Sequence, residues 1–149
     1  MSTNLRVSLH GKMVGLSPEN NLVSEGIEIS RPAVDAIITV GLEVANVRAI
    51  NIQLNDSTGS AIVDVETVEI IMFLNAARTA FAAVGGSTGI AIGTDGALLA
   101  LVAKKVFLAT SETTGSIDLS WTDTGTEVAY LGVRLPNGRI VMSAALTNA

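Results

Sequence analysis

The chain has 149 residues, no cysteine and a formal net charge of −5, with 9 Lys and Arg residues against 14 Asp and Glu residues. This length suits one domain. The lack of cysteine excludes disulfides, thiolate catalysis and Cys-ligated metals. The basic residues are scattered, so they form no patch that could bind nucleic acid. Apolar residues make up 48% of the chain and charged residues 15%, whereas soluble domains usually carry about 25% charged residues. We therefore expect apolar surfaces that are covered in an assembly, including a homo-oligomer. The alternative is a monomer whose surface is mostly Ser, Thr, Asn and Gly.

Residues 1–30 are the least regular part of the sequence. Leu5, Val7 and Leu9 alternate with polar residues and predict a short strand, and the segment LSPENN predicts a turn before another extended piece at 23–29. No long apolar core of a signal peptide is visible, and the longest uncharged apolar run, 97–103, is far shorter than the ~20 residues of a membrane helix. We expect a soluble, unprocessed protein in which residues 1–30 form an N-terminal arm ordered against a neighbouring subunit and residues 31–149 form one domain.

Residues 31–47 fit two structures. A helical face could start near Ala33, with Pro32 in its first turn. The β-branched run Ile37-Ile38-Thr39-Val40 and the following Gly41 favour a strand, and we prefer the strand.

Clear alternation begins at Arg48. Ile50, Ile52 and Leu54 alternate with polar residues and predict a strand, which the turn segment 56–59 follows. Residues 63–74 predict the next strand. Its second half, 70–74, is apolar on both faces, which is typical of a strand that is central in a sheet or covered by a partner.

Residues 75–96 leave the structure open. The Ala-rich segment 75–84, closed by Gly85 and Gly86, fits a short helix or a long loop with an edge strand. The stretch GGSTGIAIGTDG at 85–96 lacks both the lysine of a phosphate-binding P-loop and a GxGxxG pattern after a strand. We predict a flexible loop there.

The C-terminal part, from Lys104 onward, gives the clearest β pattern. Ile117, Leu119 and Trp121 alternate with polar residues, and LPNGR at 135–139 predicts a tight turn between two strands, because Pro presets φ and Asn and Gly tolerate left-handed φ. Turns recur roughly every 8–12 residues, as in sandwiches and barrels. The sequence therefore predicts an all-β, immunoglobulin-like β-sandwich with an extended N-terminal arm. Its predicted aromatic core anchors are Phe73, Phe107, Trp121 and Tyr130, the last of which could alternatively lie at an interface.

The sequence offers no constellation for catalysis. The only histidine, His10, lies in the irregular leader, so neither a Ser-His-Asp triad nor a zinc site built from His and Cys is expected. Glu66 and Glu69 would point to opposite faces of the predicted strand, so they should not converge as a carboxylate pair.

The aspartates in turns have a structural explanation. Asp56, Asp95 and Asp123 each lie near a glycine, where Asp commonly caps backbone N–H groups. The sequence NDSTGS lacks the ligand spacing of an EF-hand, and the sequon at Asn55 has no meaning without a secretory signal. We therefore predict no catalytic, cofactor-binding or metal-binding residues.

Three segments resemble a family of small structural proteins encoded by tailed bacteriophages and prophages. They are VRAINIQLNDSTGSAI at 47–62, GTDGALLALVAKKVFLATSETTGSIDLSW at 93–121 and VAYLGVRLPNGRIVMSAAL at 128–146. The shared pattern is a strand that ends in D-x-x-G, a T-x-x-x-G turn, a YLxVxLPNGR hairpin and a final strand with Ser-Ala. Residues 1–35 carry little of the likeness.

The resemblance implies an immunoglobulin-like virion protein that is present in many copies, made in the bacterial cytoplasm and located in the virion. Within a virion we favour a capsid decoration or cement protein bound over seams between major capsid proteins, with residues 1–30 reaching an adjacent subunit. Deleting that arm should then leave a folded β-domain that no longer assembles. The alternatives are a tail, tail-fibre or baseplate component, a module that binds host-surface carbohydrate and, least favoured, a hydrolase using Asp56 or Asp123.

Overall fold

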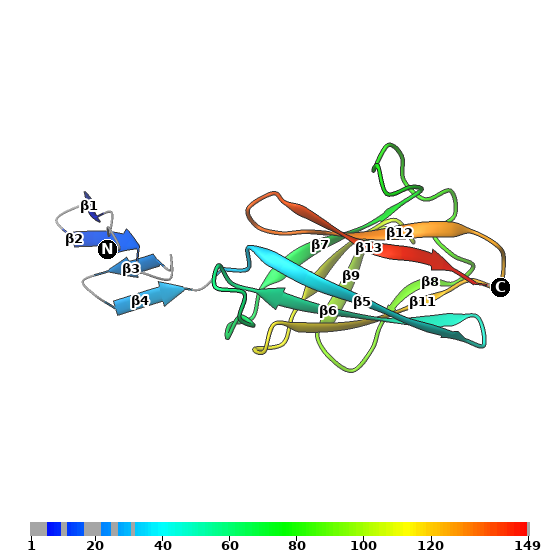
Figure 1. The fold of residues 1–149 in the computed structure, drawn as a ribbon, viewed down its shortest axis with the longest axis horizontal. Coiled ribbons are helices and arrows are strands. Elements are labelled where there is room, and N and C mark those ends of the chain that lie inside the picture. The colour runs from blue at the N-terminus through cyan, green and yellow to red at the C-terminus, as the bar shows by residue number, and fades with distance from the viewer. Residues whose placement is uncertain (1–5, 10–11, 17–21, 25–26, 31, 149) are drawn as a thin grey trace.

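The computed structural model describes residues 6–9, 12–16, 22–24, 27–30 and 32–148, and the described residues form thirteen strands and no helix (Figure 1). They accordingly contain no helix long and apolar enough to cross a membrane. The strands make three antiparallel sheets, one near the N-terminus and two in the body of the protein. The prediction of an all-β chain is confirmed.

The N-terminal sheet is a meander of four short strands, drawn in blue in Figure 1. Its strands are β1 (Arg6–Leu9), β2 (Lys12–Leu16), β3 (Leu22–Ser24) and β4 (Ile27–Ser30), and each pairs only with its neighbours in the meander. The strand expected around Val7 is present as β1. His10 and most of the LSPENN turn lie outside the described residues, and the role of residues 1–30 as an arm stays a prediction.

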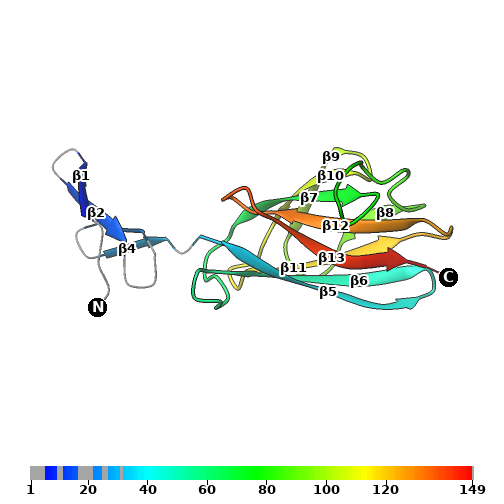
Figure 2. The ribbon, with the colours of Figure 1, turned by 45° about the horizontal axis from the view of Figure 1, so that its top comes forward.

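The body consists of two antiparallel sheets of four and five strands, consistent with a β-sandwich (Figure 2). Sheet I has the order β5-β6-β11-β8, with β5 (Asp35–Val44), β6 (Val47–Asn55), β11 (Ser116–Thr122) and β8 (Gly89–Ile92). Sheet II has the order β13-β12-β7-β10-β9, with β13 (Ile140–Thr147), β12 (Val128–Arg134), β7 (Thr67–Phe73), β10 (Val106–Thr110) and β9 (Ala97–Val102). The strand preferred for residues 31–47 is confirmed as β5.

The core lies between sheets I and II and is built from alternate residues of the facing strands. Ile50, Ile52 and Leu54 of β6 face inward, as do Ile117, Leu119 and Trp121 of β11, and all are buried. Sheet II contributes the buried side chains of Val68, Ile70, Met72, Phe107, Ala109, Ala129, Leu131 and Val133. The Trp121 indole donates a hydrogen bond to the carbonyl of Gly85, at 3.1 Å, so the largest core side chain has its polar atom satisfied.

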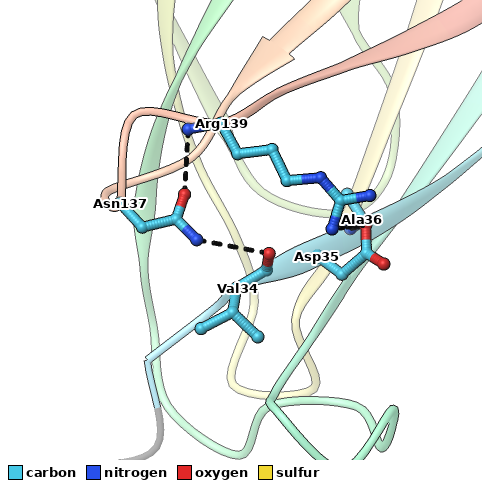
Figure 3. Close-up of polar contacts among 5 residues, drawn as sticks. All are labelled: Val34, Asp35, Ala36, Asn137 and Arg139. Atoms are coloured by element: carbon cyan, nitrogen blue, oxygen red, sulfur yellow. Dashed lines mark hydrogen bonds and ion pairs between the residues drawn. The ribbon is translucent and has the colours of Figure 1, made fainter.

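The predicted turn at 135–139 joins β12 to β13 and also holds the start of the body (Figure 3). Leu135 N–H donates to the carbonyl of Arg139 at 2.9 Å, and Gly138 has a φ of 85°. From this turn, the Asn137 amide donates to the carbonyl of Val34 at 3.4 Å, and Arg139 forms an ion pair with Asp35 at 3.2 Å. The Asn and Arg of the LPNGR segment therefore tie the C-terminal hairpin to the beginning of β5.

Two predictions about the middle of the chain were wrong in detail, and one open choice is settled. The strand predicted at 63–74 begins only at Thr67, although β7 is central in sheet II, as its two apolar faces indicated. Of the two structures left open for residues 75–84, a short helix or a loop, the structure has the loop, with turns and an isolated bridge from Phe81 to Phe73. Within it the Asn75 amide donates to the Thr79 hydroxyl at 2.7 Å. Within the supposed loop 85–96, residues 89–92 are strand β8, which pairs with β11.

Candidate functional site: the outer face and free edge of sheet II

The outer face of sheet I is mostly polar over its central strands, β6 and β11, whereas the edge strand β5 exposes Ile37 on this face. Its outward positions include Asn51 and Gln53 of β6 and Asp118 and Ser120 of β11, which alternate with buried core residues. The Asp118 carboxylate accepts hydrogen bonds from the Asn51 amide at 2.6 Å and from the Thr94 hydroxyl at 2.7 Å. This central part of the face is suited to contact with water.

The outer face of sheet II is apolar instead. Antiparallel pairing places directly opposed residues on the same side of a sheet, so Ile71 lies beside Val106 on one side, and Phe73 lies beside Tyr130. We define the apolar face as the outward apolar residues of this sheet: Ile71, Phe73, Leu99, Val106, Leu108, Tyr130, Ile140 and Met142. Exposed Phe81 extends it through the bridge to Phe73.

Two residues of the apolar face are almost covered without belonging to the core. Phe73 and Val106 are only 8% and 9% exposed, yet neither is part of the buried cluster between the sheets. Phe73 is buried, as predicted, but it lies on the outward side of β7 and outside the cluster between the sheets. Half-buried Tyr130, for which an interface was the alternative to the core, lies on the same outward side; Trp121 and Phe107 are core residues, as predicted. Sheet II carries a second apolar layer outside the core.

Gly132 explains how Phe73 becomes covered. A Cβ at this position would lie 2.7 Å from Cε2 of Phe73, 3.1 Å from Cγ2 of Ile140 and 3.2 Å from Sδ of Met142. The ring therefore lies against the bare backbone of β12, with side chains of β13 next to it. Sequence reasoning missed this contact, since a lone glycine in a strand pattern indicates close approach but not the group that approaches.

Charge is confined to one end of the apolar face. The strand residues of sheet II include only two charged side chains, Glu69 and Arg134, which form an ion pair with each other at 3.2 Å. Thr67 and Thr110 share a hydroxyl–hydroxyl hydrogen bond at 3.1 Å at the same end of β7. The rest of the face offers dispersion and apolar burial but little polar recognition.

The free edge of sheet II is strand β9. Five of its six residues are exposed, and Leu99, Leu101 and Val102 are 61%, 53% and 51% exposed. Edge strands usually carry a charge, a proline or a cover that prevents further pairing, whereas β9 has the sequence ALLALV. The opposite edge, β13, is tied to sheet I, because Arg48 of β6 donates to the carbonyl of Thr147 at 2.6 Å.

The turn aspartates are occupied by local hydrogen bonds. The Asp56 Oδ1 atom accepts from the N–H and the hydroxyl of Thr58, at 2.8 and 2.6 Å, which is the capping role predicted for it. Asp123 accepts from the N–H groups of Ser87 and Glu127, at 2.9 and 3.1 Å. These carboxylates organise loops, and no group of three or more His, Cys, Asp or Glu side chains among the described residues could hold a metal ion.

Glu66 and Glu69, which were not expected to converge, make separate contacts. Glu66 accepts a hydrogen bond from the N–H of Ala33 at 2.7 Å, and Glu69 pairs with Arg134 on the apolar face. Asp95 uses its carbonyl to accept from the N–H of Asp118 at 2.9 Å. Each of these acidic residues thus has a structural contact of its own.

The glycine-rich loop is held by a glutamate that the sequence did not single out. The Glu127 carboxylate accepts from three consecutive N–H groups, those of Val84, Gly85 and Gly86, at 2.9, 2.9 and 2.7 Å. Lys104 adds a bond from Nζ to the carbonyl of Ser87 at 2.6 Å. The first part of the stretch predicted to be flexible is therefore fastened to the neighbouring loops.

Comparison with protein-family models, with curated proteins and with solved structures finds no significant match to this chain.

Proposed function

We propose that this chain is a non-enzymatic structural subunit of a tailed-bacteriophage particle, acting as a capsid decoration or cement protein. The observation that carries the proposal is the apolar face of sheet II, which lies outside the core and has only one ion pair among its strands. Large exposed apolar patches mark interaction surfaces. The occupied carboxylates described above also favour a scaffold over a reaction centre.

The strand order supports the immunoglobulin-like part of the proposal. If β5, β6, β7, β8, β11, β12 and β13 are taken as strands A to G, the two sheets read A-B-E-D and G-F-C, the arrangement of a constant-type immunoglobulin domain. Strands β9 and β10 are then a hairpin inserted between D and E, and β10 extends sheet II next to β7. The chain departs from antibody domains in two respects: it has no cysteine, and its buried Trp121 lies on strand E rather than C.

Burial of the apolar face would supply the stabilisation. At ~25 cal/mol per Å² of apolar area, each ~100 Å² of still exposed apolar surface that a neighbour covers contributes about 2.5 kcal/mol before the costs of association. Many copies, each joined in this way, would stabilise a shell against the pressure of its genome.

Cryo-electron microscopy of the intact particle tests the proposal. Density for this chain over the seams of the head supports a decoration protein, whereas density on the tail and none on the head supports the tail alternative. Particles that lack the chain altogether would overturn both. Glycan-array binding by the isolated protein would instead favour the carbohydrate-binding module.

A variant pair tests whether the apolar face makes the contact. Ile71→Lys places a charge at the centre of the face on β7, and Gln53→Lys places one on the polar outer face of sheet I as the control. We expect the first to lose co-sedimentation with particles and the second to keep it, with both variants showing the circular dichroism of the parent protein. Equal binding by both would exclude the apolar face as the attachment surface.

A further inference from the structure

We propose that β9 pairs with β9 of a second copy of this chain, antiparallel about a two-fold axis, so that two five-stranded sheets become one sheet of ten strands. This inference rests on the proposed assembly function and specifies one of its contacts. A strand that adds to an exposed sheet edge gains main-chain hydrogen bonds along its length. Such a pairing would be isologous, since the same patch of each copy would form it.

The edge of β9 is the one best suited to receive a strand. It is uncharged over its whole length, and three of its four large side chains are more than half exposed. Strand β8, the edge of sheet I next to β9, is less suited because it has only four residues and its Ile90 packs against the core. The long edge strand β5 is less suited because it carries acidic residues at both ends, Asp35 and Glu43, and a register shift between Val40 and Glu43.

The charges that flank β9 favour a second copy as the partner. Asp95 precedes the strand, and Lys104 and Lys105 follow it. In an antiparallel pair of identical strands, the end of β9 that Asp95 precedes lies beside the end of the other copy that Lys104 and Lys105 follow, so opposite charges gather at each end of the pair. These residues do not continue the line of β9 itself, since the carbonyl of Asp95 accepts from the N–H of Asp118 and that of Lys105 from the N–H of Met72; their side chains are what would bridge the two copies. Because Lys104 already donates to the carbonyl of Ser87, Lys105 is the cation that we assign to Asp95 of the other copy. A parallel pair would bring like charges together and is therefore disfavoured.

The position of β9 in the fold agrees with a dedicated contact. The β9–β10 hairpin is the insertion that distinguishes the strand order from the plain A-to-G arrangement. Without it, the central strand β7 would form that edge of sheet II. The insertion also places Leu99 beside Leu108 on the outer side of the sheet, so pairing through β9 would join the apolar faces of two copies into one continuous surface.

The first test is a charge placed on the edge strand. Leu99→Lys should convert a dimer of the full-length protein into a monomer in size-exclusion chromatography with light scattering, because two lysines would then be forced together across the axis. Like charges in an interface should weaken pairing by about tenfold or more. Leu42→Lys is the matched control, since Leu42 is 88% exposed on the edge strand β5 of sheet I, and it should remain a dimer.

The second test is charge reversal. Asp95→Lys and Lys105→Asp should each weaken the dimer, and the double variant should restore it, because the pairs are re-formed with their signs exchanged. Rescue of this kind would not follow from a merely structural role of either residue. Failure of the double variant to recover, while circular dichroism shows all three to be folded, would contradict the antiparallel pairing.

Cysteine cross-linking checks the register independently of stability. The chain has no cysteine, so single substitutions such as Ala97→Cys and Ala100→Cys introduce the only thiol. Disulfide-linked dimers should form efficiently near the centre of β9 and poorly at its ends, whereas uniform cross-linking along the strand would indicate parallel pairing and overturn the inference. A parent protein that stays monomeric at every concentration tested would also overturn it, although its presence in particles would leave the proposed function standing.

Discussion

A single carboxylate, that of Glu127, fastens the loop between β7 and β8 to the end of the sandwich. It accepts three backbone N–H groups, and the indole of Trp121 bonds the carbonyl of Gly85 in the same loop. Glu127→Ala would leave the three N–H groups without their acceptor, so we expect the free energy of unfolding to fall by about 1–3 kcal/mol. Urea denaturation measures this, with Asp64→Ala at an exposed acidic position as the control.

Hydrogen exchange locates the effect of the same substitution. Exchange of the N–H groups of residues 84–86 should accelerate in Glu127→Ala by more than the loss of global stability explains. Exchange of the N–H groups in the β6 and β11 core should change only as much as global stability does. Unchanged protection of 84–86 would show that Lys104 and Trp121 suffice to hold the loop.

Gly132 is the residue on which the covered position of Phe73 depends. In Gly132→Ala, the new methyl group would have to displace the Phe73 ring, since the two carbons would be 2.7 Å apart. We expect a loss of about 1–3 kcal/mol in the free energy of unfolding, as for other overpacked sites, together with increased exposure of the ring. Gly125→Ala is the control, because its methyl group would meet its nearest neighbour, Oδ1 of Asp123, at 3.4 Å; equal losses in both variants would contradict the explanation.

At the scale of elements, the β5–β6 hairpin has a turn whose sequence does not suit its backbone. Ala45 and Asn46 have φ values of 52° and 68°, the positive pair that two-residue hairpin turns require. Asn adopts this conformation readily, whereas Ala does not. Ala45→Asn should therefore raise the free energy of unfolding by about 0.5–1 kcal/mol. Thermal unfolding measures the change, and Ala103→Asn, in a turn where Ala103 lacks positive φ, should produce no gain.

Local sequence predicted those elements whose pattern and turn chemistry agree. The alternation at Ile117, Leu119 and Trp121 and the LPNGR turn specify β11 and the β12–β13 hairpin within a few residues. The structure of 75–96 could not be predicted, because the segment is held by distant groups. Glu127 fixes the N–H groups of 84–86, and β8 forms only because β11 offers its edge. The intrinsic strand propensity of a segment carries no information about the distant residues that bond to it.

For the whole molecule, composition predicted excess apolar surface but could not say where it lies. Both faces of β7 are apolar in sequence, and only the register with β12 and β10 shows that Phe73 and Ile71 form a layer outside the core. The same holds for β9, whose uncharged sequence fits a buried strand as well as an edge. The candidate surface thus emerges from sheet order rather than from any motif.

The body should fold without the N-terminal sheet. None of its strands pairs with β1–β4. Residues 32–36 are bonded to the body itself, because Ala33 N–H donates to Glu66 at 2.7 Å and Val34 N–H donates to the carbonyl of Asn55 at 2.9 Å. Deleting residues 1–30 keeps these bonds, so thermal unfolding should show one cooperative transition with a midpoint close to that of the full chain. A broad or lost transition would show that the body depends on the deleted segment.

The same deletion separates two kinds of contact. If residues 1–30 are the arm that reaches another particle protein, the shortened chain should no longer co-sediment with particles, yet it should still pair through β9. Lys105→Asp should behave in the opposite way, because it keeps the arm and the apolar face and weakens only the pairing through β9. In this scheme the arm attaches the chain to the particle, and β9 joins copies of the chain to one another. Loss of dimers on deleting 1–30 would instead place the homotypic contact in the N-terminal sheet.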